Sequence, residues 1–251
     1  MTIGLICAIP EELAHLQDLL DDATPTTIGH AEFREGLLAG RRVVLAGAGM
    51  GKVNAAIVTT VLAERFRCDA VVLSGVAGGL DPTLDIGDVV IADHIVQHDC
   101  GRIENETLLS YQPGHVSFIN PTGQLGYQTD AELLARVTAC LDGVELPVIP
   151  RAAGGRDRPP RITAGTILTG DQYIHCEATR GQLHEKFGAS AVEMEGGAVA
   201  QVCETFGIPW LVIRALSDLA GRDSSIDFPL FVDRVASISA TVLCRILPAI
   251  R

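Results

Sequence analysis

Short unbroken runs of apolar residues alternate along the chain with stretches in which apolar residues recur every three or four positions. The unbroken runs, typical of strands buried on both faces of a sheet, cover residues 3–8, 69–74, 162–168 and 210–216. The segment from Pro10 to Leu20 shows the second pattern and predicts an amphipathic helix. Strands that alternate with helices in this way predict a single α/β domain over residues 1–251 with a central mixed sheet.

Glycine, proline and acidic residues mark where the remaining elements begin and end. Two strands are expected on either side of a turn at Gly40, another ends near Val96, and helices are expected at 53–66, 130–142, from about 195 to 206, and 228–247. Gly188 is expected to end a helix, and Asp227 to cap the last one with Pro229 in its first turn. The glycine-rich segments 47–51 and 75–80 are expected to be loops, as are the longer stretches 100–128 and 147–160.

Composition and charge narrow the classes of partner. The chain has 251 residues, 47% of them hydrophobic, and a net charge of -12, which argues against nucleic acid or an anionic membrane as a partner. No apolar run approaches the roughly 18–20 residues of a membrane span, and residues 1–10 read as a first strand, not a signal peptide. The seven cysteines are scattered and form no CxxC pair, so we expect reduced thiols in a cytoplasmic protein.

The segment 43–54 reads as a strand, a glycine loop and a helix. It lacks the glycine spacing of a dinucleotide fingerprint, and Gly51-Lys52 is followed by Val53, where a phosphate-binding P-loop needs Ser or Thr. These glycines instead suit a close approach of backbone to a ligand or a neighbouring strand. We expect neither a cofactor nor a metal.

Three carboxylates are predicted at the carboxyl ends of strands, where α/β folds bind ligands: Glu12, Glu195 and Asp218. Each also has a structural interpretation. Glu12 and Glu195 can be first-turn acids that favour a helix N-terminus, and Arg214 with Asp218 can be a buried ion pair. An arginine inside the otherwise apolar strand 210–216 is the hardest of these to explain by packing alone.

An ordered set of motifs resolves this ambiguity by resemblance. The chain resembles the 5'-methylthioadenosine/S-adenosylhomocysteine nucleosidases of the purine nucleoside phosphorylase-type family nearly end to end, and actinobacterial members in particular through Gln97-His-Asp99 and Tyr111-Gln-Pro-Gly-His115. The motifs that carry the resemblance are Ala8-Ile-Pro-Glu-Glu12, Gly49-Met-Gly-Lys-Val53, Gly75-Val-Ala-Gly-Gly-Leu80, Gly87-Asp-Val-Val90, Thr169-Gly-Asp171, Val192-Glu-Met-Glu195 and Arg214-Ala-Leu-Ser-Asp218. The resemblance implies a three-layer α/β/α, nucleoside phosphorylase-like fold, a small nucleoside substrate and a homodimer.

The resemblance also implies a role for each site residue. Asp218, beside Ser217, would protonate N7 of adenine, and Glu12 would activate the attacking water near Arg214. Glu195 would bind the ribose hydroxyls with the backbone of Met194 and with Glu193. Tyr173 would stack on adenine, and the backbone of Ile174 would read the base edge. The segment Val76-Ala77-Gly78 and the apolar side chains of Ile9, Met50 and Phe228 would complete the substrate pocket.

Two departures and three rival functions remain open at this stage. The family commonly has Ser at position 76, where this chain has Val, and the segment 147–161 is longer than the family leads us to expect. A phosphorylase needs a cation near Leu73-Ser74, where the chain has none, and Glu12 would repel phosphate. A futalosine or aminofutalosine hydrolase shares the motifs. A non-catalytic nucleoside-binding protein needs no acid-and-base pair. Sequence leaves open the preference among methylthioadenosine, S-adenosylhomocysteine and 5'-deoxyadenosine.

Overall fold

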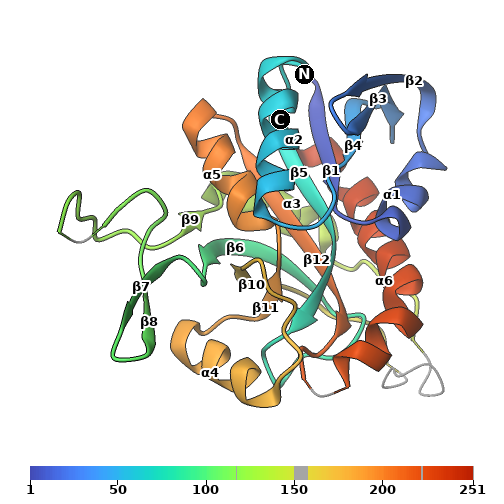
Figure 1. Ribbon diagram of the computed structural model, residues 1–251. Helices are drawn as coiled ribbons and strands as arrows, with labels where there is room; N and C mark the ends of the chain where they lie inside the picture. Colours follow the sequence, from blue (N-terminus) through green and yellow to red (C-terminus); the bar gives the residue numbers. More distant parts are fainter. Residues whose placement is uncertain (117, 150–157, 222, 251) are drawn as a thin grey trace.

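One twisted sheet runs through the molecule, with helices on both faces, in a computed structural model that describes residues 1–116, 118–149, 158–221 and 223–250 (Figure 1). Nine strands follow one another in the order β11-β10-β6-β12-β5-β1-β4-β3-β2, and β9 pairs with β6. The strands are β1 Ile3–Cys7, β2 Asp21–Ile28, β3 Ala31–Leu38, β4 Arg41–Gly47, β5 Ala70–Gly79, β6 Val89–Gln97, β9 Tyr127–Gln128, β10 Ile162–Thr169, β11 Ala191–Glu193 and β12 Trp210–Asp218. The predicted mixed α/β sheet is confirmed, since parallel and antiparallel pairs occur together.

Part of the sheet closes on itself. Strand β11 pairs in parallel with β10 and also in antiparallel register with the last residues of β5, Gly78 and Gly79. The strands β5, β12, β6, β10 and β11 therefore form a ring. This closure brings the carboxyl ends of β5, β11 and β12 together, which is where the candidate chemistry was expected.

The helices divide between the two faces of the sheet (Figure 1). On one face lie α2 Lys52–Glu64 and α5 Gly196–Phe206. On the other lie α1 Pro10–Gln17, α3 Ala131–Leu141 and α6 Ser224–Ile246, followed by a short 3-10 turn, Leu247–Ala249. Helix α4 Glu177–Phe187 covers the end of the ring. The hairpin of β7 Gly101–Glu104 and β8 Thr107–Ser110 stands apart from the sheet.

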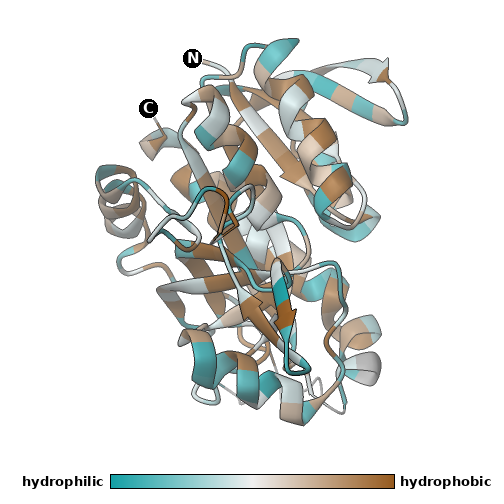
Figure 2. Cartoon of the chain, turned by 60° about the vertical axis from the view of Figure 1, so that its left-hand side comes forward, coloured by the Kyte–Doolittle hydropathy of each residue, from teal (hydrophilic) through white to brown (hydrophobic). Residues whose placement is uncertain are grey.

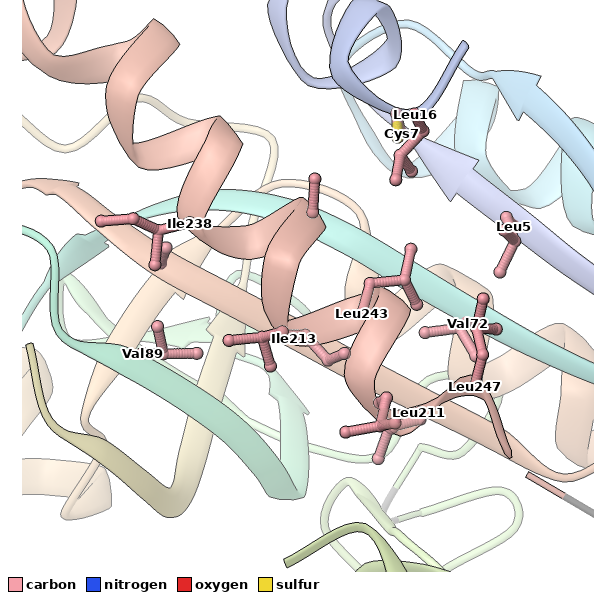
Figure 3. Close-up of a cluster of buried hydrophobic side chains, with 14 of the residues drawn as sticks. Leu5, Cys7, Leu16, Val72, Val89, Leu211, Ile213, Ile238, Leu243 and Leu247 are labelled. Atoms are coloured by element: carbon pink, nitrogen blue, oxygen red, sulfur yellow. The ribbon is translucent and has the colours of Figure 1, made fainter. Parts of the chain in front are cut away.

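Successive side chains of the central strands point to opposite faces of the sheet and pack into two separate hydrophobic cores. Leu5, Val72 and Ile213 point toward α1, α3 and α6, and Figure 3 shows them packed with Ile238 and Leu243 of α6. Their strand neighbours face the other core, under α2 and α5. The strands accordingly form an apolar interior in Figure 2, with polar residues on the outer helices. Burial on both faces explains why the central strands appear in the sequence as unbroken apolar runs.

The structure corrects several expected boundaries. Residues 75–79, expected as a glycine loop, continue β5, because this strand must pair with both β12 and β11. The last helix begins at Ser224 after Asp223, so Asp227 lies in its first turn instead of capping it, and Pro229 lies inside the helix. Strand β2 was not predicted, since its polar, exposed residues show no alternation.

The segments that connect the main elements agree only partly with the prediction. Gly188 ends α4 in the left-handed conformation, φ 61°, as predicted. The stretch 100–128 contains β7, β8 and β9, and the inserted segment 147–160 falls partly on residues 150–157, outside the described residues. Within the described ranges, no helix is both long enough and apolar enough to cross a membrane.

Candidate active site

A cavity opens at the carboxyl ends of the ring strands, with an empty volume of about 700 Å3, its open mouth included, which is a size typical of small-molecule sites. Every residue predicted for the site except Arg214 lines it, and Arg214 lies directly behind its wall. Its lining comprises Ala8, Ile9, Glu12, Met50, Val76, Ala77, Gly78, Gln172, Tyr173, Ile174, Val192, Glu193, Met194, Glu195, Ser217, Asp218, Ala220 and Phe228. Sequence reasoning missed Ala8, Gln172, Val192 and Ala220.

Glu12 sits in the first turn of α1, and its carboxylate turns back to the backbone. Its Oε2 accepts hydrogen bonds from the N–H groups of Ala8 at 2.6 Å and Ile9 at 3.2 Å, and its Oε1 accepts one from Val76 at 2.9 Å. Glu12 therefore does stabilise the first turn of α1, as the structural interpretation expected, and it also lines the cavity wall. Burial raises the pKa of Glu12, against the opposing influence of Arg214 and the three N–H donors.

Arg214 is fully buried and holds the acidic groups together from behind. Its Nη2 donates to Glu195 Oε2 at 3.0 Å and makes a short hydrogen bond to Glu193, while its Nη1 lies 3.9 Å from Glu12 Oε1. Among the residues that the structure describes, Nη1 and Nε have no hydrogen-bond acceptor. The structural alternative, an ion pair between Arg214 and Asp218, is wrong, because the partners of Arg214 are the glutamates.

Gly75 makes the approach of Arg214 to Glu12 possible. A Cβ atom at this position of β5 would lie 2.3 Å from Glu12 Oε1 and 2.4 Å from Arg214 Nη1. Both distances are far inside van der Waals contact, so any side chain here would separate the two groups. The glycine-rich sequence 75–79 therefore serves a close side-chain approach within a strand, not a loop.

Glu193 and Glu195 face different partners, although only Met194 separates them. Glu193 accepts hydrogen bonds from the N–H groups of Glu195 and Gly196 at 3.0 and 2.8 Å, from Thr169 Oγ1 and from Arg214. It therefore caps α5, the role that was the structural alternative for Glu195. Four donors from the protein occupy Glu193, which leaves it little capacity to accept ribose hydroxyls itself; it still lines the cavity, and its assisting role stays a prediction.

Glu195 instead directs its carboxylate across the cavity floor. Its Oε1 accepts the N–H of Gly51 at 2.7 Å, and its Oε2 accepts Arg214 Nη2 at 3.0 Å. The pKa of Glu195 is raised to about 7, chiefly by burial: Glu193 and Glu12 also raise it, whereas Arg214 and the Gly51 N–H lower it. Its remaining lone pairs face the cavity and can accept hydrogen bonds from hydroxyl groups.

Asp218 ends β12 on the opposite wall. The pairing of β12 with β5 slips between Leu216 and Asp218, so Ser217 is an extra residue and both Ser217 and Asp218 reach the cavity. The carboxylate accepts Ser217 Oγ at 3.0 Å and the N–H of Ala220 at 2.8 Å. Burial raises the pKa of Asp218 in spite of these two hydrogen bonds. Ala220 adopts a left-handed φ of 51°, which no sequence signal indicated.

Aromatic side chains form the outer wall. The rings of Tyr173 and Phe228 meet edge to face, with centroids 6.2 Å apart, and Tyr173 Oη donates to the carbonyl of Ser224 at 3.0 Å. Met50 is 61% exposed at the rim. At the position where the family commonly has Ser, the side chain of Val76 packs into the core under α6. This part of the wall therefore offers no hydroxyl, and the backbone N–H of Val76 is used by Glu12.

The donor set suits an organic ligand better than a metal ion. In the described part of the chain, no group of three or more His, Cys, Asp or Glu side chains is arranged to hold a metal. The clustered glutamates are neutralised by Arg214, a cation already built into the fold. The arrangement can bind a polyhydroxyl ligand at Glu195, donate a proton from Asp218 and accept one at Glu12.

Comparisons with known proteins agree with this geometry. The family model described as the phosphorylase superfamily matches residues 2–248. The 5'-methylthioadenosine/S-adenosylhomocysteine nucleosidase of Mycobacterium bovis is 58% identical over 250 residues, which is 100% of this chain and 98% of that protein.

Solved structures show the same fold. The futalosine hydrolase of Helicobacter pylori superposes with a TM-score of 0.84 at 28% identity, covering 99% of this chain and 97% of that one. The methylthioadenosine/S-adenosylhomocysteine nucleosidase of Colwellia psychrerythraea, in complex with adenine, has a TM-score of 0.83 at 31% identity, covering 100% and 96%. With a superfamily model that spans almost its whole length and a nucleosidase relative that shares more than half its residues, the chain belongs to the phosphorylase superfamily and, within it, to the family of 5'-methylthioadenosine/S-adenosylhomocysteine nucleosidases.

Proposed function

We propose that the protein hydrolyses the N-glycosidic bond of 5'-methylthioadenosine and S-adenosylhomocysteine, releasing adenine and the 5-substituted ribose. The observation that carries this proposal is the presence of Glu12 and Asp218 in the wall of one cavity, each with a pKa raised by burial. The acid must be protonated near neutral pH, which the raised pKa of Asp218 favours, and the base must be ionised, which Arg214 and three backbone N–H donors favour at Glu12.

Asp218 is the proposed general acid. Adenine leaves poorly as an anion, so its N7 takes a proton as the bond to ribose breaks. The bulge at Ser217 turns the Asp218 carboxyl into the cavity, and Tyr173 and Phe228 supply aromatic faces on the same side for the base to stack on. The Ser217 hydroxyl and the Ala220 N–H fix the carboxyl in one orientation.

Glu195 and Glu12 are proposed to act on the sugar. Glu195, oriented by Gly51 and Arg214, accepts hydrogen bonds from the ribose hydroxyls, and the carboxylates stabilise the positive charge that develops on the ring. Glu12 removes a proton from the water that attacks C1'. Arg214 Nη1 lies 3.9 Å from Glu12 Oε1 and has no hydrogen-bond acceptor among the described residues, so it is the proposed second contact for that water, a task for which Val76 offers no hydroxyl.

A futalosine or aminofutalosine hydrolase is the second candidate. It is favoured by the Helicobacter pylori futalosine hydrolase, whose fold matches as well as the nucleosidase folds do. The 58% identity to a named nucleosidase, against 28% to that hydrolase, places methylthioadenosine first. A phosphorylase is disfavoured because Glu12 occupies the cavity wall and β5 carries no cation at Leu73 or Ser74.

Adenine release from methylthioadenosine, measured with and without phosphate, tests the proposal. We expect free methylthioribose at a rate that phosphate does not change, because water is the nucleophile. Methylthioribose 1-phosphate formed only with phosphate present would show a phosphorylase and contradict the role of Glu12. Adenine release from aminofutalosine but not from methylthioadenosine would favour the second candidate, and release from neither would favour a binding protein.

We also propose a homodimer that completes the pocket around the 5' substituent. Support comes from three apolar side chains exposed beside the cavity rim, Met50 at 61%, Val53 at 70% and Ile57 at 48%. Val53 and Ile57 lie one turn apart on α2, so they present one continuous apolar stripe that continues to Met50 in the cavity wall.

Charged residues in this stripe are expected to give a monomer. Val53→Asp with Ile57→Asp should halve the mass found by sedimentation and raise KM for methylthioadenosine, since the pocket loses its outer wall. Leu19→Asp, at a site 53% exposed beyond the end of α1, is the matched control and should leave the mass unchanged. A wild-type chain that sediments as a monomer would contradict the dimer.

The cysteines and the single sheet support proposals on location and domain structure. The seven cysteines are all unpaired, which suits a reducing compartment, and we propose the cytoplasm and a role in methionine salvage. We propose that residues 1–251 act as one domain, because a single sheet joins the N-terminal and C-terminal elements.

A further inference from the structure

Three motif residues outside the catalytic set form a closed cluster beside the cavity. Lys52 Nζ lies 2.7 Å from Asp99 Oδ1 and 3.8 Å from Asp171 Oδ2. The backbone N–H of Lys52 donates to Asp171 Oδ1 at 2.8 Å, and the N–H of Asp171 donates to Asp99 Oδ2 at 2.9 Å. The cluster thus joins the start of α2, the end of β6 and the loop after β10. We call these three residues the clasp.

The clasp lies next in sequence to Gly51, whose N–H donates a hydrogen bond to Glu195, the proposed ribose-binding group. The N–H of Gly51, directly before Lys52, donates to Glu195 Oε1 at 2.7 Å. Gly51 has φ 97°, which favours glycine, and its Cα faces Asp171 so closely that a Cβ would lie 3.2 Å from Asp171 Oδ1. The position of the Gly51 N–H is therefore set from one side by Glu195 and from the other by the clasp.

We propose that Lys52, Asp99 and Asp171 are positioning residues that hold the Gly51 N–H against Glu195, so that this carboxylate presents its free lone pairs to the ribose hydroxyls. The proposal rests on the proposed function, in which Glu195 binds ribose. The three residues come from elements that are far apart in the sequence, and among the described residues the hydrogen bonds and ion pairs of their side chains join one member of the clasp to another. It contributes no atom to the cavity lining, so it acts through Gly51.

The charge balance around Glu195 shows why this one donor matters. Arg214 on β12 favours the ionised carboxylate, whereas Glu193 on β11 and Glu12 on α1 disfavour it, as does burial. With the pKa of Glu195 at about 7, loss of the Gly51 donor raises it and leaves less carboxylate at neutral pH. The ionised form is the acceptor for ribose, so activity should then be lost at a higher pH on acidification.

The chain provides a matched pair of variants, because Lys52 and Lys186 are its only lysines. Lys186 Nζ also joins two segments, since it donates to the carbonyl of Leu108 and to Ser110 Oγ. In Lys52→Met we expect the acid limb of kcat/KM for methylthioadenosine to move up by about one pH unit. A shift of this size corresponds to the free energy of roughly one hydrogen bond to a charged group. At neutral pH kcat/KM should fall about fivefold, mainly through KM, because the ionised fraction of Glu195 falls from about one half to about one tenth.

The controls separate positioning from simple stabilisation. Lys186→Met should keep the wild-type acid limb, and Lys52→Arg should restore it partly, with thermal unfolding confirming that each variant is folded. Asp99→Asn, which preserves shape, should shift the limb in the same direction and stands in for Lys52→Met should that variant not fold. If the acid limbs of Lys52→Met and Asp99→Asn coincide with that of Lys186→Met, the clasp is structural only. A wild-type enzyme without adenine release would overturn the proposed function, and the role of the clasp with it.

Discussion

Replacing Asp218 by asparagine is expected to lower kcat/KM for methylthioadenosine by about 100- to 10,000-fold, the usual contribution of a general acid. Asparagine keeps the shape of the side chain: its Oδ1 can still accept the N–H of Ala220, and its Nδ2 can donate to the hydroxyl oxygen of Ser217. It cannot transfer a proton to adenine N7. Substrate binding should therefore survive while bond cleavage fails, which equilibrium binding and single-turnover adenine release would show separately.

The pH dependence of the rate tests whether Asp218 acts in its protonated form. Because burial raises the pKa of Asp218, its proton is retained toward neutral pH, and the wild-type rate should fall as pH rises through that pKa. The Asp218→Asn variant has no such group, so its residual rate should lack this basic limb. Asp227→Asn, the same change in the first turn of α6, is the control: it removes a nearby charge that raises the pKa of Asp218, so the basic limb should remain but begin at a lower pH. Turnover of Asp218→Asn close to wild type would rule out Asp218 as the acid.

The fold was predictable from sequence wherever burial alone decides the structure. Strands β1, β5 and β12 are buried on both faces, so their apolar runs were visible without any knowledge of neighbours. Strand β2 was missed because an exposed edge strand carries no such run. The extension of β5 through Gly78 and Gly79 was missed for another reason: it depends on pairing with β11, which lies more than a hundred residues later.

The site divides in a similar way between what local sequence indicates and what long-range packing decides. The positions of Glu12, Glu195 and Asp218 at strand ends were predictable, since carboxyl ends of strands meet at one edge of the sheet. The division of labour between Glu193 and Glu195 was not, because it depends on Thr169, Gly51 and Arg214. The same three-dimensional contacts decide that Arg214 pairs with glutamates and not with its neighbour in sequence, Asp218.

Replacing Arg214 by methionine is expected to lower the free energy of unfolding by about 3–5 kcal/mol at neutral pH, the usual cost of leaving a buried charge without its partner. Glu12, Glu193 and Glu195 all lie within 4.0 Å of this guanidinium and are almost fully buried. Without it, burial keeps the folded-state pKa values of Glu12 and Glu195 above those of the unfolded chain. Activity should fall as well, since both the proposed base and the ribose-binding group lose their charged partner.

The pH dependence of that loss follows from the sign of the shift. Where a carboxyl pKa is higher in the folded state, the folded state binds more protons, so stability falls as pH rises above the unfolded value of about 4.3. The stability deficit of Arg214→Met should therefore be smallest near pH 5 and grow toward neutral pH, as urea unfolding at several pH values would show. Arg158→Met is the matched control: Arg158 also bridges two carboxylates, Asp85 and Asp88, but its side chain is 27% exposed, so its loss should cost less. A deficit for Arg214→Met that is independent of pH, or no larger than that for Arg158→Met, would mean that Arg214 does not neutralise the glutamate cluster.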